Sequence, residues 1–429
     1  MMIDRAIQPR IRPVEKPLLV EPVKVILDNG VPVYQLNAGT QDVCKIDFIF
    51  GAGSWQQQIQ LQAGLTNAML QEGSVNYRAE VIAEKIDFHG AWLQLMADQH
   101  QGTISIVTLT RHLPQLMPVI EEMVRKSVFP VREFETLVAR RKQRFLLENE
   151  KVKVLSQKKF SEALFGEGHP YAQTVKEEDF DSIQRESLIG FYHSYYHSGN
   201  CEILIAGRFD ESLTGLVNTC FGRNDWKNDA ALVRQSPIPR PSFEKKLFVN
   251  KPGAIQSAIR VGKMMVRKTH PDYLPLQVLV TILGGYFSSR LMTSIREEKG
   301  YTYGIGAHLV SMRHEGYLVI ATEVDKRYEQ ATLDGIFREL GKLREEPVTK
   351  EELERVRQYL LGEFLRELDG PFAWAQAFLN VHEFGLGYDF YEKYYRTIVG
   401  ISPEQLKHLA EMYFQEETFY TIIAGRETL

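Results

Sequence analysis

The sequence predicts an α+β fold of two similar lobes, each a mostly antiparallel sheet layered with helices, related by internal duplication. Three observations lead to this fold class. Strand-like and helix-like segments occur in clusters in both halves. A long segment is repeated, and a proline-rich stretch lies between the repeats. The length of 429 residues suits two domains of ordinary size.

The repeat pairs residues 187–210 with residues 404–427. Each segment reads as an aromatic-rich helix, a short polar break, an apolar strand and then Ile-Ala-Gly-Arg, with Gly207 and Gly425 at equivalent points. A repeat of this length indicates duplicated domains rather than a solenoid of short units.

The stretch between the repeats contains Pro237, Pro239 and Pro241 at alternate positions, which favours an extended, semi-rigid linker. We therefore place the domain boundary near residue 235. This gives an N-terminal lobe of residues 1–234 and a C-terminal lobe of residues 235–429.

The first half opens with a strong hairpin signal, because residues 23–37 read as two strands around Asp28-Asn29-Gly30. Residues 59–71 predict a helix whose apolar side includes Leu65 and Met69. The other elements expected, in order, are strands over 44–53 and 102–109, a helix over 111–129 with Pro114 in its first turn, a strand over 254–265 and a helix over 273–287.

Composition excludes several classes of protein. The chain is 44% hydrophobic and 25% charged with a net charge of −4, so it lacks the basic footprint of a nucleic-acid binder. Its three cysteines have no CxxC spacing, which argues against a disulfide framework and a cysteine zinc site. We find no signal-like or bilayer-length apolar run and expect a cytoplasmic protein with no membrane partner.

Several segments of the first half resemble the insulinase/pitrilysin family, which includes mitochondrial processing peptidase and bacterial two-lobed relatives. They read NGVPVYQLN (29–37), FIFGAGSWQQ (48–57), AGLTNAMLQEGS (63–74) and GEGHPYAQTV (166–175). The resemblance covers the chain from about residue 20 to the end. In active relatives the helix after Gly-Leu carries the inverted zinc motif HxxEH.

The chemistry of that motif depends on its spacing. Two histidines four residues apart share a helical face and bind zinc, and the glutamate takes the proton from the zinc-bound water. Aligned on Gly64-Leu65, the three positions here hold Asn67, Leu70 and Gln71. The resemblance therefore implies a degenerate motif, with no metal and no catalytic residue in this chain.

Other candidate zinc ligands are weak. The resemblance places a further ligand glutamate between residues 143 and 150, where Glu148 and Glu150 lie, but one carboxylate does not hold zinc. His193 and His197 have i, i+4 spacing without the adjacent glutamate, and we interpret them as side chains of a helix end. His169-Pro170-Tyr171 matches a family element that we interpret as structural.

The most specific segment is TILGGYFSSRLMTSIREEKGYTYGIGAHL (281–309), which resembles the substrate-binding element of the family's second lobe. The resemblance implies that Arg296 binds substrate carbonyl oxygens and that Tyr303 donates to the substrate backbone or the developing oxyanion. An arginine at a helix end and a tyrosine in a strand also fit ordinary exposed positions.

We expect the neighbours of this pair to be structural. Gly284 and Gly285 allow a close approach of helix and loop. Ser288, Ser289 and Arg290 support the turn, and the strand after Tyr303 offers an edge for an extended peptide.

The combination resembles the zinc-free subunits of this family. It implies a non-catalytic subunit of a heterodimeric zinc metalloendopeptidase, inactive alone, with zinc in a homologous HxxEH-bearing partner and an unfolded peptide as substrate. Two alternatives stay open: a peptide-binding or scaffolding homodimer with no proteolytic role, and an independent peptidase with a rewired site. The intact Arg296–Tyr303 block favours the subunit over the scaffold, and the loss at Asn67, Leu70 and Gln71 weighs against the independent enzyme.

Overall fold

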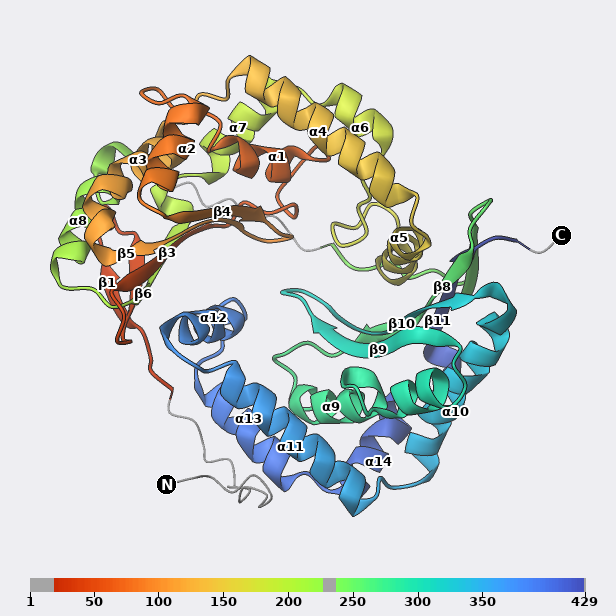
Figure 1. Cartoon of the computed structure of the whole chain (residues 1–429). Helices are drawn as coiled ribbons and strands as arrows, with labels where there is room; N and C mark the ends of the chain where they lie inside the picture. The colour runs from red at the N-terminus through yellow and green to blue at the C-terminus, as the bar shows by residue number, and fades with distance from the viewer. Residues whose placement is uncertain (1–18, 227–236, 428–429) are drawn as a thin grey trace, which may run out of the picture.

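The computed structural model describes residues 19–226 and 237–427, which form two lobes (Figure 1). Each lobe is built on one β-sheet. The two sheets face each other, and most of the helices cover their outer sides.

The sheet of the first lobe has six strands in the order β1-β2-β6-β3-β5-β4. The β2–β6 pair is parallel and the other neighbouring pairs are antiparallel. The strands are β1 (Val23–Ile26), β2 (Pro32–Asn37), β3 (Val43–Phe50), β4 (Trp92–Ala97), β5 (Gly102–Leu109) and β6 (Cys201–Gly207).

The sheet of the second lobe has five strands in the order β7-β11-β8-β10-β9. The β7–β11 pair is parallel and the others are antiparallel. The strands are β7 (Lys246–Asn250), β8 (Gln256–Met265), β9 (Thr302–Ser311), β10 (Gly316–Asp325) and β11 (Tyr420–Gly425).

The two sheets have the same topology once the extra hairpin strand β1 is set aside. In each sheet the strand in second place, β6 or β11, is the last strand of that sheet in the sequence. It pairs in parallel with the strand in first place, β2 or β7. Gly207 and Gly425, singled out by the sequence repeat, end β6 and β11. The predicted α+β fold of two duplicated, mostly antiparallel lobes is confirmed.

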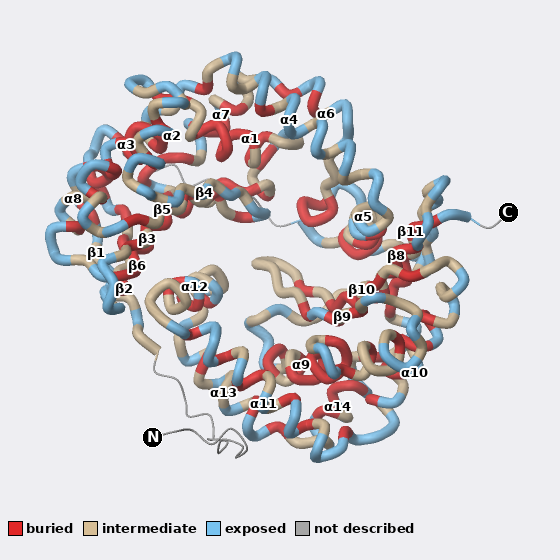
Figure 2. The backbone as a smooth tube through the Cα atoms, in the orientation of Figure 1, coloured by how far each residue is buried: buried red, intermediate tan, exposed pale blue. Residues whose placement is uncertain are grey.

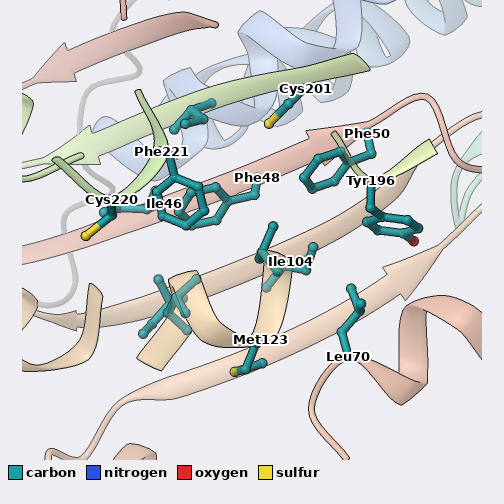
Figure 3. Packing of buried hydrophobic residues seen from close by; sticks show 14 of the residues in the cluster. Ile46, Phe48, Phe50, Leu70, Ile104, Met123, Tyr196, Cys201, Cys220 and Phe221 are labelled. Atoms are coloured by element: carbon teal, nitrogen blue, oxygen red, sulfur yellow. The ribbon is translucent and has the colours of Figure 1, made fainter. Parts of the chain in front are cut away.

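Helices cover one face of each sheet and bury a core between the two layers. Figure 2 shows that buried residues gather along the strands of the sheets and in the helices packed on them. The core of the first lobe centres on rings such as Phe48, Phe50 and Phe221, all fully buried (Figure 3). The helices of the first lobe are α1 (Gln62–Met69), α2 (Ala79–Phe88), α3 (Leu113–Arg125), α4 (Val131–Asn149), α6 (Glu177–Ser182), α7 (Arg185–Tyr195) and α8 (Ser212–Phe221). Those of the second are α9 (Tyr273–Val280), α10 (Glu329–Glu345), α11 (Lys350–Arg366), α13 (Asp389–Gly400) and α14 (Pro403–Tyr413).

Two helices lie on the inner faces and are exchanged between the lobes. Helix α5 (Val152–Phe165), from the first half, packs on β8 and β11 of the second sheet. Helix α12 (Pro371–His382), from the second half, packs on β2 and β6 of the first sheet. Because each lobe lends a helix to the other, the lobes are tied together by core packing as well as by the linker.

The three predicted helices are shorter in the structure, and the one expected over 111–129 is α3 (Leu113–Arg125), with Pro114 in its first turn. The helix expected over 59–71 is α1, which begins after Leu61, whose φ is +71°, and ends at Met69 before a turn at Gly73 with φ +149°. The helix expected over 273–287 is α9, which ends at Val280 and continues to Gly285 as a π-helix. A side chain at Gly284 would meet the backbone nitrogen of Ala307 at 2.7 Å, so the close approach expected at this glycine is present.

The predicted boundary at residues 234 and 235 lies outside the described residues. The described chain resumes at Pro237 and runs beside the end of α5. There the backbone N–H of Arg240 donates to the carbonyl of Phe165 (2.8 Å) and that of Ser242 to the carbonyl of Ala163 (2.9 Å).

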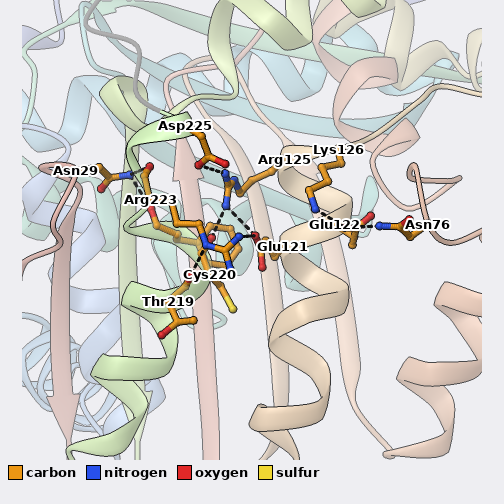
Figure 4. Close-up of polar contacts among 11 residues, drawn as sticks. Asn29, Asn76, Glu121, Glu122, Arg125, Lys126, Thr219, Cys220, Arg223 and Asp225 are labelled. Carbon is orange, nitrogen blue, oxygen red and sulfur yellow. Dashed lines mark hydrogen bonds and ion pairs between the residues drawn. The ribbon is translucent and has the colours of Figure 1, made fainter.

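A polar seam joins α3 to the end of α8 (Figure 4). The Arg125 guanidinium binds the Glu121 carboxylate (2.7 Å) and the carbonyl oxygen of Cys220 (2.8 Å). The Glu122 carboxylate accepts hydrogen bonds from Lys126 (2.7 Å) and Asn76 (2.9 Å). Since these buried carboxylates have cationic or amide partners, the seam is structural.

Besides the linker and the exchanged helices, a cluster of five aromatic and histidine side chains joins the lobes. We call this cluster the interlobe joint, and it consists of Trp55, His100, His169, Tyr171 and His314. The His314 ring, from the β9–β10 turn, stacks on Trp55 of the first lobe at 4.5 Å between centroids. His100 Nε2 lies 2.8 Å from the Tyr171 hydroxyl oxygen, which also accepts a hydrogen bond from the backbone N–H of His314 (3.1 Å). The second lobe is thereby anchored in an aromatic pocket of the first.

The joint predicts a loss of stability at acid pH. Burial, helped by the charge of Arg313, lowers the pKa of His100 to about 3. Burial also lowers the pKa of His169 and His314. The unfolded chain therefore binds more protons, so the stabilisation is complete above about pH 6.5 and is lost as the pH falls below it.

For His100 alone this loss is on the order of 2 kcal/mol between pH 7 and pH 5. Urea unfolding at a series of pH values measures it, and His100→Gln should flatten the pH dependence. His193→Gln, at an exposed histidine of α7, is the matched control. Equal slopes for both variants would contradict the assignment.

Among the described residues, no helix combines the length and the apolar composition needed to cross a membrane.

Candidate functional site

The first position of the degenerate zinc motif is buried in the first lobe. Asn67 is 1% exposed, and its amide donates to the Tyr196 hydroxyl (3.2 Å) and to the carbonyl of Thr103 (3.4 Å). Tyr196 is fully buried, and burial raises the pKa of its hydroxyl above the usual range. The amide thus bridges α1 to β5 and to the chain after α7, which is a structural role.

The side chains at the other two motif positions lie in different surroundings. Leu70 lies in the hydrophobic core and is 0% exposed (Figure 3). Gln71 is half-buried and lines a hollow of about 620 Å³ beside Trp92 of the edge strand β4. Because α1 ends at Met69, Gln71 lies beyond the helix, so the shared helical face required by the zinc motif is absent here.

The surroundings of the motif also do not suit a cation. Glu148 and Glu150 pair with Lys151 (2.7 Å) and Lys251 (2.6 Å). Burial raises the pKa of the Glu72 carboxyl, and the guanidinium of Arg140 on α4 acts on it in the opposite direction. Within residues 19–226 and 237–427, no three His, Cys, Asp or Glu side chains gather closely enough to hold a metal ion.

The histidine pair of the aromatic helix also stays apart. His193 is exposed near the end of α7, whereas His197 is 4% exposed and its Nε2 lies 3.1 Å from the carbonyl oxygen of Ser194. His169 belongs to the interlobe joint, in agreement with a structural interpretation of His169-Pro170-Tyr171.

Rebuilding the motif tests how far the site has diverged. We expect the triple variant Asn67→His, Leu70→Glu, Gln71→His to be destabilised by at least the roughly 2–5 kcal/mol of a core Leu→Ala change, since a carboxylate would enter the core. We also expect no tight zinc binding, because the two new histidines would lack the third protein ligand, a carboxylate, that completes such a site. Urea unfolding and zinc titration measure both, with the double variant that keeps Leu70 as control. A stable, zinc-loaded triple variant would show that only the ligands had been lost.

The Arg296–Tyr303 block is intact, and a bulge in the sheet edge explains its geometry. Tyr303 lies near the start of the edge strand β9, where the β9–β10 register shifts between Thr322 and Val324. The Thr302 hydroxyl donates to the carbonyl of Glu323 (2.8 Å), and the Thr322 hydroxyl donates to the Thr302 hydroxyl (2.8 Å). This network fixes the bulge, and the Tyr303 side chain extends outward with 96% of its surface exposed.

Arg296 fixes the backbone of that tyrosine. It lies in a π-helical turn (Met292–Glu297), and its Nε donates to the carbonyl of Tyr303 at 2.9 Å. Its guanidinium carbon also lies 4.7 Å from the ring centroid of Phe287. One edge of the guanidinium therefore positions Tyr303, and among the described residues its terminal nitrogens form one ion pair, a loose one with Glu297 (3.7 Å).

Phe287 is a site residue that the sequence reasoning missed. It is 62% exposed, although it is a large apolar side chain. The signal was present, because Phe287 precedes the Ser288-Ser289-Arg290 turn in the same matching block. Only the fold shows that its ring lies against Arg296.

The turn residues have the supporting role expected of them. Ser289 is 1% exposed, and its backbone N–H donates to the carbonyl of Tyr286 (3.1 Å). Arg290 forms two hydrogen bonds of 2.8 Å with the carboxylate of Glu352 on α11. These contacts anchor the segment before Arg296 to the second lobe.

Comparison with known proteins bears on the fold and the family of the chain. Residues 182–360 match the family model described as the peptidase M16 inactive domain. The chain is 24% identical to the uncharacterized zinc protease YmxG of Bacillus subtilis over 80% of this chain and 83% of that protein. It is 22% identical to the probable inactive metalloprotease YmfF of the same organism over 38% of each chain. A crystal structure of a peptidase M16 inactive domain from Pseudomonas fluorescens superposes with a TM-score of 0.83 at 22% identity, over 95% of this chain and 99% of that one.

Fold and site together define a two-lobed relative of zinc peptidases in which the motif positions carry no ligand side chains. Residues 182–360 match the M16 inactive-domain family, and the chain is similar to M16-type zinc proteases, in agreement with the insulinase/pitrilysin resemblance of its sequence. The inactive-domain match and the similarity to YmfF support a non-catalytic relative of M16 peptidases.

Proposed function

We propose that this chain is the non-catalytic subunit of a heterodimeric zinc metalloendopeptidase. A homologous partner bearing HxxEH supplies the zinc and the glutamate base, and this chain supplies Arg296 and Tyr303 to the shared substrate chamber. The substrate is an unfolded peptide. We also propose that the complex is cytoplasmic, as expected from the sequence.

The exposed hydroxyl of Tyr303 is the observation that carries the proposal. Among the described residues it has no recorded hydrogen-bond partner, while the backbone around it is fixed by Arg296, Thr302 and Thr322. An unpaired donor on a fixed stretch of backbone is suited to bind an oxygen that arrives with a substrate. A scaffold without substrate would have no use for this arrangement.

Zinc chemistry is assigned to the partner because the residues at the motif positions do not fit the ion. The amide of Asn67 is engaged by Tyr196, Leu70 lies in the core, and the guanidinium of Arg140 lies close enough to Glu72 to influence its pKa. Neither amide nor alkyl groups replace imidazole as zinc ligands.

The test is reconstitution. We expect the purified chain to leave an unstructured peptide intact, to co-elute with an HxxEH-bearing homologue from the same organism, and to raise that homologue's cleavage rate. A homologue that cleaves equally well alone, with no complex on a sizing column, would refute the subunit assignment and favour the scaffolding homodimer.

A further inference from the structure

A second polar hollow lies on the inner face of the second sheet, beside the bulge that carries Tyr303. Its volume is about 330 Å³, and helix α5 closes it from the first half of the chain. It is lined by Lys153 and Ser156 of α5, Arg260 of β8, Gly304 and His308 of β9, and Glu323 of β10.

A glycine leaves the inner face of β9 open next to Tyr303. A side chain built at Gly304 would meet nothing within 4 Å, so the face of β9 next to Tyr303 is open. Gly306, two residues on, also lines the hollow. The Nε2 atom of His308 would lie 3.1 Å from a Cβ built at Gly306, so His308 covers that glycine and the open backbone is at Gly304.

The cations of the hollow lack carboxylate partners. The Arg260 guanidinium donates to the neutral acceptors Ser156 Oγ (3.2 Å) and Gln157 Oε1 (3.4 Å). In the described part of the chain, neither Arg260 nor Lys153 has a recorded ion pair. Burial lowers the pKa of the Arg260 guanidinium, while Tyr317 and the carboxylate of Glu323 act on it in the opposite direction, so the cation is partly desolvated and Glu323 is the nearby carboxylate that acts on it.

The balance of charge in the hollow is positive. Arg260 and Lys153 bring two permanent cations against the single carboxylate of Glu323. Burial lowers the pKa of His308, so that imidazole is neutral near pH 7. A guanidinium with free donors next to an ammonium is a preferred partner of carboxylates.

We infer that this hollow is a carboxylate-binding subsite, which accepts an acidic side chain or the free C-terminal carboxylate of an extended peptide lying along β9. The inference rests on the proposed function in one respect, that the ligand is a peptide held near Tyr303. It adds a chemical preference, for an acidic group a short distance from the residue that Tyr303 contacts.

The experiment uses the isolated full-length chain, so that it does not depend on a catalytic partner. Four fluorescent peptides of one unstructured sequence combine Glu or Gln at a central position with a free or amidated C-terminus. Fluorescence anisotropy gives the Kd of each. We expect removal of the recognised carboxylate to weaken binding about tenfold, as a charge-assisted hydrogen bond implies.

The variants separate the hollow from general electrostatics. Arg260→Gln and Lys153→Ala should each abolish the preference for the carboxylate, and the exposed position of Lys153 makes its variant safe for folding. Lys151→Ala, at a nearby lysine of the loop before α5 that pairs with Glu148, should leave the preference unchanged.

Each outcome decides the matter. A preference that follows the central Glu identifies an acidic side-chain subsite, and one that follows the C-terminus identifies a terminal-carboxylate subsite. Four equal Kd values, an absence of binding, or a preference retained in both hollow variants would overturn the inference. If no complex with a catalytic homologue forms but the preference is found, the proposed function fails and the subsite stands.

Discussion

Replacing Tyr303 by phenylalanine is expected to lower the kcat/KM of the reconstituted heterodimer by about 10²–10³-fold, the usual effect of removing one oxyanion donor. The ring would remain in place because the bulge is fixed by Thr302 and Thr322, so only the hydroxyl is lost. Steady-state cleavage of an unstructured fluorogenic peptide measures the change.

Tyr301→Phe is the matched control. Tyr301 lies two residues away but stacks on Tyr328, with ring centroids 4.6 Å apart, so its variant should keep near-wild-type kinetics. Equal effects of Tyr301→Phe and Tyr303→Phe, or none from either, would refute the role of the Tyr303 hydroxyl.

Arg296→Lys tests whether the arginine positions that tyrosine. Lysine has no Nε donor in the place where Arg296 donates to the carbonyl of Tyr303. We expect a loss of about tenfold in kcat/KM, the size of one hydrogen bond to a charged group. The part of this loss that comes from positioning should disappear when Tyr303 is already phenylalanine, since the hydroxyl that Arg296 positions is then absent. Fully additive losses would show that Arg296 acts on substrate independently.

The largest effect on stability is expected at the interlobe joint. Trp55 is 2% exposed, and its ring lies 4.7 Å from that of Tyr171 and 4.5 Å from that of His314. Trp55→Ala should lower the free energy of unfolding by about 3–5 kcal/mol, as for other buried aromatic side chains. Urea unfolding followed by circular dichroism measures this loss.

Trp92→Ala provides the control for Trp55→Ala. Trp92 is 68% exposed on the edge strand β4, and its removal should change stability by less than about 0.5 kcal/mol. Small-angle scattering of the Trp55 variant in native buffer should also show a larger radius of gyration, because the His314 ring loses its stacking partner in the first lobe and the turn keeps only its contacts with Tyr171 and His100. If the two tryptophan variants were equally stable, the joint would not hold the lobes.

Much of the fold could be predicted because its signals are local. The hairpin at Asp28-Asn29-Gly30 and the apolar strands follow from turn chemistry and alternation, and the Ile-Ala-Gly-Arg repeat revealed the duplication. The exchange of α5 and α12 could not be predicted, since it depends on contacts between residues far apart in the chain. The bounds of α1 were missed because the left-handed Leu61 delays its start and the turn at Gly73 ends it, against an apolar pattern that continues to Leu70.

The candidate site was predictable to the extent that residue types alone decide its chemistry. Asn67, Leu70 and Gln71 lack the groups that zinc requires in any geometry. The contact between Arg296 and the backbone of Tyr303 depends on a bulge and a π-helical turn, which no residue pattern specifies. Phe287 lies in the matching block, but its contact with Arg296 depends on the fold. Arg260 does not stand out in the sequence, because its neighbours come from other elements.

The zinc content of the purified chain, measured by elemental analysis with peptidase activity on the same sample, tests the central claim most directly. The account predicts far less than one zinc per chain and no cleavage of an unstructured peptide at neutral pH, with activity restored by an HxxEH-bearing homologue. About one zinc per chain together with cleavage by the chain alone, the stoichiometry of a single catalytic site, would contradict it.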